Sequence, residues 1–333
     1  MTMAVLTDGR VPASTAETRL RLRVASKQIC AEGIAAFDLV FPDGAELPAF
    51  TAGAHIDVFL PGSITRQYSL RNDPHERHRY AIGVLREPNG RGGSAYMYDA
   101  LDVGAAIETS LPRNAFELDE KASFSLLLAG GIGVTPILAM AHRLATLGHE
   151  FAFHYCARSA GRMAFREEIE TSSFASRTHF HLDDGPPEQK LDLSALLSRR
   201  EAGAHLYACG PAGFLDAVVS QSKGAWPPET VHREYFANAA MPTPGGDTAF
   251  TVTLASDGRS FDIPPGRSII EVLGENGVHV PMSCEQGICG TCMTRVISGV
   301  PDHRDLVLTD RQRADHMTLC CSRARTTELV LDL

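Results

Sequence analysis

The sequence feature that most constrains the fold is a group of five cysteines within the last 50 residues of this 333-residue chain. Three are spaced as Cys284-x4-Cys289-x2-Cys292, and the adjacent pair Cys320 and Cys321 follows after a gap of 27 residues. The N-terminus has no basic segment followed by an apolar one, so no signal peptide is indicated and we expect a cytoplasmic protein. Without a signal peptide, clustered cysteines are more typical of metal or redox chemistry than of disulfides.

The spacing is that of plant-type [2Fe-2S] ferredoxins, whose cluster is held by four cysteine thiolates. Gly287 and Gly290 lie inside the loop and let the backbone wrap closely, so that amide N–H groups can point at the sulfurs. A structural zinc site is the alternative, but such sites favour two tight Cys-x2-Cys pairs. The fourth ligand must be Cys320 or Cys321, and only one of them can bind, because adjacent residues of an extended segment point to opposite faces. The spacing does not choose between them.

Length and composition describe a soluble chain of two or three domains. Hydrophobic residues make up 44% and charged residues 21%, which is typical of globular proteins. No apolar run approaches the roughly 20 residues of a transmembrane helix. The net charge is -9, and no block of Lys or Arg interrupts the chain. We therefore expect neither a membrane nor nucleic acid as a partner.

Hydrophobic periodicity divides the chain into three folding units. Alternating runs with Gly, Pro and Asp turns predict an antiparallel barrel, and continuous apolar runs alternating with helical patterns predict a parallel sheet. The third unit opens with a hairpin and a capping box. We expect a leader over residues 1–16, a barrel domain over 17–120, an α/β domain over 121–237, a linker over 238–248 and a C-terminal domain over 249–333.

Two strand-to-helix turns are candidates for binding a dinucleotide. The first holds Gly130, Gly131 and Gly133, and glycines there let a pyrophosphate approach the amides at a helix N-terminus. Pro136 replaces the last glycine of Gly-x-Gly-x-x-Gly, so an ordinary tight turn is the alternative.

The second turn is Cys209-Gly210-Pro211, at the edge where open parallel sheets bind ligands, and a plain helix start is its alternative. Arg158 and Arg162 follow the second strand of the same sheet, where a 2′-phosphate could sit. These arginines leave the choice between NADH and NADPH open.

Two segments of the barrel combine groups that suit a flavin. Residues 66–70, Arg-Gln-Tyr-Ser-Leu, offer a cation for a phosphate, an aromatic face for an isoalloxazine ring and a hydroxyl for its reactive nitrogen. A surface strand with an exposed arginine is the alternative. Residues 90–94, Gly-Arg-Gly-Gly-Ser, form a candidate anion nest, and a flexible loop is the alternative.

With these segments assembled, the chain resembles the phthalate dioxygenase reductase and vanillate O-demethylase reductase family, within the ferredoxin-NADP reductase superfamily. The resemblance runs from about Arg19 to Leu333. It rests on the cysteine loop and on residues 66–70, 90–94, 130–136, 209–211, 234–236, 301–305 and 319–324. It implies a multidomain α/β and β fold: an antiparallel flavin-binding barrel, a parallel-sheet nucleotide-binding domain and a C-terminal β-grasp ferredoxin domain.

The resemblance also implies which residues hold each cofactor. For FMN, rather than FAD, they are Arg66, Gln67, Tyr68, Ser69, Gly83, Val84, Arg91, Gly92, Gly93, Ser94, Thr135 and Phe236. For NAD they are Gly130, Gly131, Gly133, Arg158, Cys209, Gly210 and Pro211. For the cluster they are Cys284, Cys289, Cys292 and Cys320, with Cys321 left as a buried thiol.

The implied activity is electron transfer. NADH delivers a hydride to the flavin, single electrons pass to the cluster, and a Rieske-type oxygenase accepts them for hydroxylation or O-demethylation of an aromatic substrate. Such chemistry depends on positioning rather than on a general acid or base. Ser69, beside the flavin nitrogen, and Cys209, beside the nicotinamide, are the nearest to catalytic residues. A cytochrome P450 or other monooxygenase is an alternative acceptor, and a redox-sensing or binding protein is an alternative function. We expect a monomer.

Overall fold

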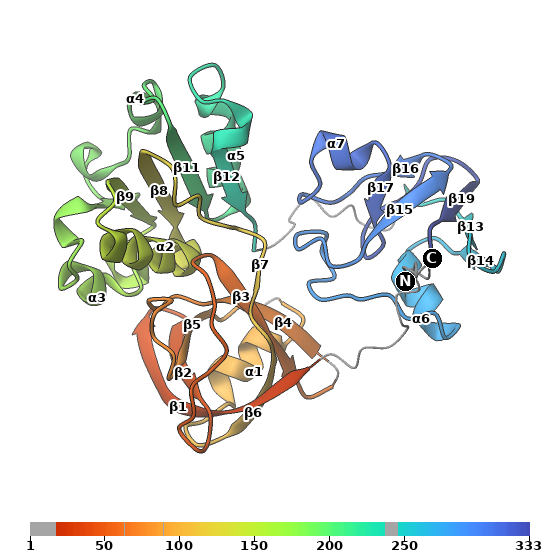
Figure 1. The fold of residues 1–333 in the computed structure, drawn as a ribbon, viewed down its shortest axis with the longest axis horizontal. Helices are drawn as coiled ribbons and strands as arrows, with labels where there is room; N and C mark the ends of the chain where they lie inside the picture. The colour runs from red at the N-terminus through yellow and green to blue at the C-terminus, as the bar shows by residue number, and fades with distance from the viewer. Residues whose placement is uncertain (1–17, 63, 89, 237–245) are drawn as a thin grey trace, which may run out of the picture.

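The computed structural model describes residues 18–62, 64–88, 90–236 and 246–333 (Figure 1). The expected leader and most of the expected linker lie outside these residues. Three bodies are visible: an antiparallel barrel, a parallel sheet with helices, and a small C-terminal unit. This is the predicted multidomain architecture. No helix of the described part of the chain is both long and apolar enough to span a membrane.

The barrel forms because apolar and polar residues alternate along its strands. In β1, Leu20, Leu22 and Val24 point inward while their neighbours are more exposed. The strands pair in the order β4-β3-β6-β1-β2-β5, and β7 pairs with β3. The elements are β1 (Arg19–Ala31), β2 (Ile34–Val40), β3 (Ala54–Leu60), β4 (Ile64–Ser69), β5 (Tyr80–Leu85), α1 (Gly93–Asp99), β6 (Ala106–Ser110) and β7 (Arg113–Asn114).

The parallel sheet is covered on both faces, which explains its continuous apolar strands. Residues of β8 contribute alternately to the two hydrophobic clusters that lie on opposite faces of the sheet. The strand order is β10-β9-β8-β11-β12, with every neighbouring pair parallel. The elements are β8 (Phe124–Gly130), α2 (Val134–Leu147), β9 (Phe151–Ala157), α3 (Arg166–Glu170), β10 (Thr178–Leu182), α4 (Leu193–Leu197), β11 (Ala204–Cys209), α5 (Ala212–Ser222) and β12 (Val231–Glu234).

The C-terminal unit is a mixed sheet in the order β14-β13-β19-β15-β17, with a small second sheet of β16 and β18. The expected hairpin is β13 with β14, and the expected capping box at Ser268 and Glu271 begins α6. The elements are β13 (Phe250–Leu254), β14 (Ser260–Ile263), α6 (Ile269–Glu275), β15 (Met293–Ser298), β16 (Pro301–Asp302), α7 (Asp310–Arg313), β17 (His316–Thr318), β18 (Arg323–Ala324) and β19 (Glu328–Leu331).

Candidate redox site

The cysteine loop brings its sulfur atoms together in one place. The Cys284 sulfur contacts those of Cys289 and Cys320, and the Cys320 sulfur also contacts Cys292. The backbone N–H groups of Gln286 and Ile288 donate to the Cys284 sulfur at 3.4 and 3.5 Å. These sulfur contacts, followed by the two amide bonds, lower the pKa of Cys284 despite its burial. The two amide N–H groups in particular favour a thiolate at Cys284, the form in which cysteine binds a metal.

The glycines of the loop are required by its shape. Gly287 and Gly290 have φ angles of +68° and +74°, which L side chains rarely adopt. A Cβ atom at Gly287 would also lie 2.4 Å from the Cys321 sulfur and 2.9 Å from the Asp305 Cα atom. The Leu306 N–H group donates to the Gly287 carbonyl at 2.9 Å, which ties the loop to the following segment.

The two adjacent cysteines have different surroundings. The Cys320 sulfur contacts Cys284 and Cys292, whereas the Cys321 sulfur lies 3.2 Å from the Thr318 hydroxyl and 3.9 Å from the Ser322 hydroxyl. Of the other four cysteines, Cys321 contacts Cys320. This arrangement favours Cys320 as the fourth ligand.

The donor set fits a binuclear cluster. Two of the sulfur contacts pair Cys284 with Cys289 and Cys292 with Cys320, and a [2Fe-2S] cluster takes two protein ligands at each iron. Within the described ranges, no three His, Cys, Asp or Glu side chains are grouped so as to hold a single metal ion.

The cysteine loop rests on the barrel. The Ser283 hydroxyl donates to Asp57 Oδ1 at 2.6 Å, and Arg113 Nη2 donates to Asp57 Oδ2 at 2.5 Å. Asp57 is only 1% exposed. Arg91, predicted near the FMN phosphate, donates to the Cys284 carbonyl at 3.1 Å and pairs with Glu285. The segment expected to bind phosphate therefore also contacts the cluster loop.

The flavin segment of β4 carries an unpaired buried hydroxyl. Tyr68 OH has no hydrogen-bond partner among the described residues, and burial raises the pKa of this phenol. Arg66 Nη2 donates to the Arg91 carbonyl at 3.3 Å, and a Cβ atom at Gly93 would lie 2.7 Å from Arg66 Cγ. These predicted residues therefore lie together, and the orphan hydroxyl fits a ligand with hydrogen-bonding atoms, such as a flavin.

Of the remaining predicted flavin residues, Gly83 and Thr135 lie at the seam between barrel and sheet, and Val84, Gln67 and Ser94 have other surroundings. A Cβ atom at Gly83 would lie 2.8 Å from Thr135 Cγ2, so β5 and α2 meet closely there. Val84 packs in the barrel core, so its side chain does not face a ligand. The Gln67 amide lies 3.1 Å from the His55 ring nitrogen. The Ser94 hydroxyl accepts a bond from the Glu87 N–H group at 3.1 Å.

A buried carboxyl group connects the two residues that we expected to be nearest to catalytic. The Ser69 hydroxyl donates to Glu234 Oε2 at 3.5 Å, and the Cys209 thiol donates to the same oxygen at 3.9 Å. Burial raises the pKa of Glu234 to about 8, although both bonds oppose this, and burial with the nearby Glu234 raises the pKa of Cys209. Glu234 belongs to one of the segments that carry the family resemblance, but the sequence alone assigned it no role. The signal that could have identified it is an ionisable residue at the C-terminal end of β12, an edge strand of the parallel sheet.

Substituting Glu234 with glutamine is expected to change how stability depends on pH. An unfolded glutamate loses its proton near pH 4.5, whereas the folded one keeps it to about pH 8. The folded state therefore binds more protons in this window, and wild-type stability falls with rising pH by up to about 1.4 kcal/mol per pH unit. Melting temperatures of both proteins from pH 5.5 to 8 test this. The melting temperature of the variant should rise relative to that of the wild type as pH rises. A constant difference between the two melting temperatures contradicts the raised pKa of Glu234.

A cavity of about 1090 Å³ lies beside these residues, between barrel and sheet. A Cβ atom at Gly133 would lie 2.3 Å from the Cys209 carbonyl oxygen, so the two predicted turns pack against each other only with glycine there. Cys209 itself is buried. Asp183 and Lys190 also line the cavity, and the sequence does not point to them because β10 and the loop after it carry no motif. The predicted residues that line the cavity are Gly130, Gly131, Gly133, Arg158, Arg162, Gly210, Pro211 and Phe236.

Two family models match the chain. A 2Fe-2S iron-sulfur cluster binding domain matches residues 252–325, and an oxidoreductase NAD-binding domain matches residues 127–220. The vanillate O-demethylase oxidoreductase of Pseudomonas sp. (strain HR199 / DSM 7063) is 48% identical over 313 residues, which cover 93% of this chain and 98% of that protein. The phthalate dioxygenase reductase of Burkholderia cepacia is 44% identical, with 94% and 97% covered.

Solved structures agree with these relatives. A phthalate dioxygenase reductase, described as a modular structure for electron transfer from pyridine nucleotides to [2Fe-2S], matches with a TM-score of 0.75 and 44% identity. The match covers 95% of this chain and 98% of that one. An intact type IV self-sufficient cytochrome P450 monooxygenase matches with a TM-score of 0.82 and 34% identity, covering 97% of this chain and 43% of that one.

Proposed function

The chain belongs to the phthalate dioxygenase reductase and vanillate O-demethylase reductase family, and from this premise we propose that it delivers electrons to a Rieske-type oxygenase. It is an oxidoreductase of the kind that passes electrons from NADH through FMN to a [2Fe-2S] cluster. We further propose a cytoplasmic monomer that transfers electrons for hydroxylation or O-demethylation of an aromatic substrate.

One observation carries the proposal: the barrel contacts the nucleotide-binding domain on one side and the cysteine loop on another. Glu234 joins Ser69 of the barrel to Cys209 of the parallel sheet. Asp57 of the barrel holds Ser283, which directly precedes a cluster ligand. A flavin bound in the barrel would therefore lie between the electron donor and the cluster. This order on one chain is what an electron-transfer reductase needs.

The side chains around the predicted cofactor sites would position and polarise the flavin and the nicotinamide, and would form no covalent bond with them. Bound FMN would supply hydride acceptance and one-electron release. Tyr68 and Arg66 would bind the ring and its phosphate arm, and the Ser69 hydroxyl would be oriented by Glu234. Protonated Glu234 adds no negative charge beside the incoming hydride, because burial keeps it neutral up to about pH 8.

A cytochrome P450 is the second candidate acceptor, and the 0.82 TM-score with a self-sufficient P450 favours it. That protein is more than twice as long, since the match covers 43% of it. Relatives of similar length include several that are named as parts of oxygenase systems. We therefore place the oxygenase first. Substrate-dependent oxygen consumption, measured with a purified Rieske oxygenase and with a purified P450, separates the two acceptors.

The visible spectrum of the purified protein tests the electron chain directly. We expect yellow-brown material with overlapping flavin and iron-sulfur bands, and nearly complete bleaching by NADH under anaerobic conditions. Dithionite serves as the control, because it reduces both centres without using the nucleotide site. A colourless protein that contains only zinc would refute the proposal, and bleaching by dithionite but not by NADH would refute the NADH step.

A further inference from the structure

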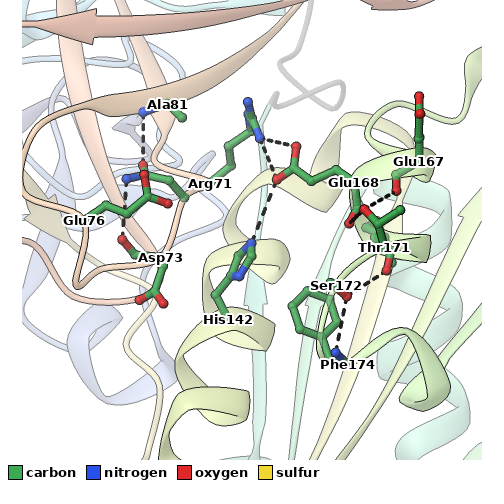
Figure 2. A network of polar contacts seen from close by, with 12 residues as sticks. Arg71, Asp73, Glu76, Ala81, His142, Glu167, Glu168, Thr171, Ser172 and Phe174 are labelled. Carbon is green, nitrogen blue, oxygen red and sulfur yellow. Dashed lines mark hydrogen bonds and ion pairs between the residues drawn. The ribbon is translucent and has the colours of Figure 1, made fainter.

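A group of charged side chains, in which Arg71 is buried and Glu168 and His142 are partly exposed, joins the barrel to the nucleotide-binding domain, outside the residues assigned above (Figure 2). Arg71 lies two residues beyond Ser69 and is 6% exposed. Its Nη1 atom donates to both carboxylate oxygens of Glu168 in α3, at 2.9 and 2.7 Å. His142 of α2 points at the same carboxylate, with Nε2 3.9 Å from Oε1. The barrel, α2 and α3 therefore meet at one carboxylate.

Phe165 makes the second contact of Arg71. This residue precedes α3 with φ of 61°, a left-handed conformation that is unfavourable for a bulky side chain. The Arg71 guanidinium carbon lies 4.3 Å from the centre of the Phe165 ring, within cation–π range. The strained residue is thus held by the same arginine that pairs with its helix.

The Phe165 ring also reaches the seam where the barrel meets the helix of the nucleotide-binding domain. A Cβ atom at Gly83 would lie 3.1 Å from Phe165 Cζ and 2.8 Å from Thr135 Cγ2. Gly83 belongs to β5 and Thr135 to the first turn of α2, beside the Gly130–Gly133 turn. Through the Phe165 ring, Arg71 therefore contacts one side of the seam at which flavin and nicotinamide would meet.

The charges in this group hold one another in place. Burial works to raise the pKa of Glu168, but the contacts with His142 and Arg71 outweigh it and lower the pKa. The carboxylate stays ionised, so the guanidinium keeps its partner. Removing the Glu168 charge leaves the buried Arg71 guanidinium without this carboxylate and releases the geometry that the pair fixes, at a lower cost than in a fully buried pair because the Glu168 side chain is 38% exposed.

We propose that Arg71 is a positioning residue for hydride transfer: through Glu168 and Phe165 it sets how the nucleotide-binding domain meets the flavin-binding strand. This inference rests on the proposed electron chain, because it concerns the geometry of its first step. Hydride transfer requires the reacting atoms to lie about 3 to 3.5 Å apart, and a misplacement of about 1 Å can cost about 100-fold in rate.

The test compares Glu168→Gln with Glu170→Gln, two identical changes on one short helix. Glu170 pairs with Arg166 at 2.7 Å, and both side chains are more than 40% exposed. The measured quantity is the rate constant for anaerobic flavin reduction at saturating NADH, with ordinary NADH and with NADH deuterated at nicotinamide C4. We expect a decrease of about 10- to 100-fold for Glu168→Gln, with a clear isotope effect, and less than a twofold change for Glu170→Gln. Arg71→Met should behave like Glu168→Gln, and Arg71→Lys should recover part of the rate.

Two further measurements separate positioning from general damage. In flavin-free protein, amide hydrogen exchange in α3 and the first turn of α2 should increase for Glu168→Gln but not for Glu170→Gln. Cluster reduction by dithionite should remain at the wild-type rate. If Arg71→Met fails to fold, Glu168→Gln decides, because it removes one charge and keeps the side-chain shape. An unchanged flavin reduction rate at saturating NADH, or equal losses in both glutamine variants, overturns the inference. If NADH fails to reduce wild-type protein, the electron chain is wrong instead.

Discussion

Replacing Cys320 with serine is expected to abolish the [2Fe-2S] cluster, and replacing Cys321 with serine is expected to leave it in place. The Cys320 sulfur contacts both Cys284 and Cys292, whereas the Cys321 sulfur lies among the Thr318 and Ser322 hydroxyls. Serine is a much poorer ligand for iron at this kind of site, because soft thiolates are preferred there. At Cys321, a serine hydroxyl would keep the polar contacts.

Iron content and the electron paramagnetic resonance signal of the reduced cluster measure this difference. Cys320→Ser should contain flavin but less than about a tenth of the wild-type iron, whereas Cys321→Ser should contain wild-type amounts of both. Flavin reduction by NADH serves as the internal control for folding, because it takes place in the other two domains. A cluster that survives Cys320→Ser and is lost in Cys321→Ser would reverse the ligand choice.

The sequence predicts the three bodies because each follows from local periodicity. The alternation of β1 reflects burial on one face, and the continuous apolar run of β8 reflects burial on both faces. Either pattern can be recognised from the residues of the strand itself. The cysteine loop is likewise local apart from its distant fourth member, and the geometry now favours Cys320 over Cys321. The glycines at Gly133 and Gly287 were also recognisable, since close approach of two backbones leaves glycine as its signal.

Contacts between domains could not be predicted in this way. Arg71 and Glu168 are 97 residues apart, and Asp57 and Ser283 are 226 apart, so neither pair leaves a local pattern. The position of Asp57 contradicts the pattern, because the alternation along β3 predicts that this charged residue faces water, whereas it is buried. The outer face of that strand is instead covered by the cysteine loop. Buried charged groups at such junctions are where sequence patterns and tertiary structure disagree.

Substituting Asp57 with alanine is expected to slow electron delivery to the cluster while flavin reduction by NADH keeps its wild-type rate. The carboxylate holds Ser283 at 2.6 Å and Arg113 at 2.5 Å inside the junction between barrel and cysteine loop. Loss of Asp57 breaks both contacts and weakens the docking of the cluster loop, at a cost below the roughly 3 to 5 kcal/mol of a fully buried pair because the Arg113 side chain is 35% exposed. Ser283→Ala removes one hydrogen bond, for which about 1 kcal/mol is typical, so its effect should be smaller.

The two steps are separable by anaerobic stopped-flow absorbance, because flavin and cluster bands bleach at different wavelengths. With Asp57→Ala, flavin bleaching by NADH should match wild type, and cluster bleaching should slow at least about tenfold, since a docked geometry becomes a minor population. Glu108→Gln is the matched control, because its pair with Arg19 lies on the same barrel with both side chains about half exposed. Exposed pairs contribute about 0 to 1 kcal/mol, so that variant should transfer electrons normally. A wild-type rate of cluster bleaching in Asp57→Ala would show that the cluster receives electrons without this junction. The contact between the barrel and the cysteine loop would then not be what holds the flavin and the cluster in place for electron transfer.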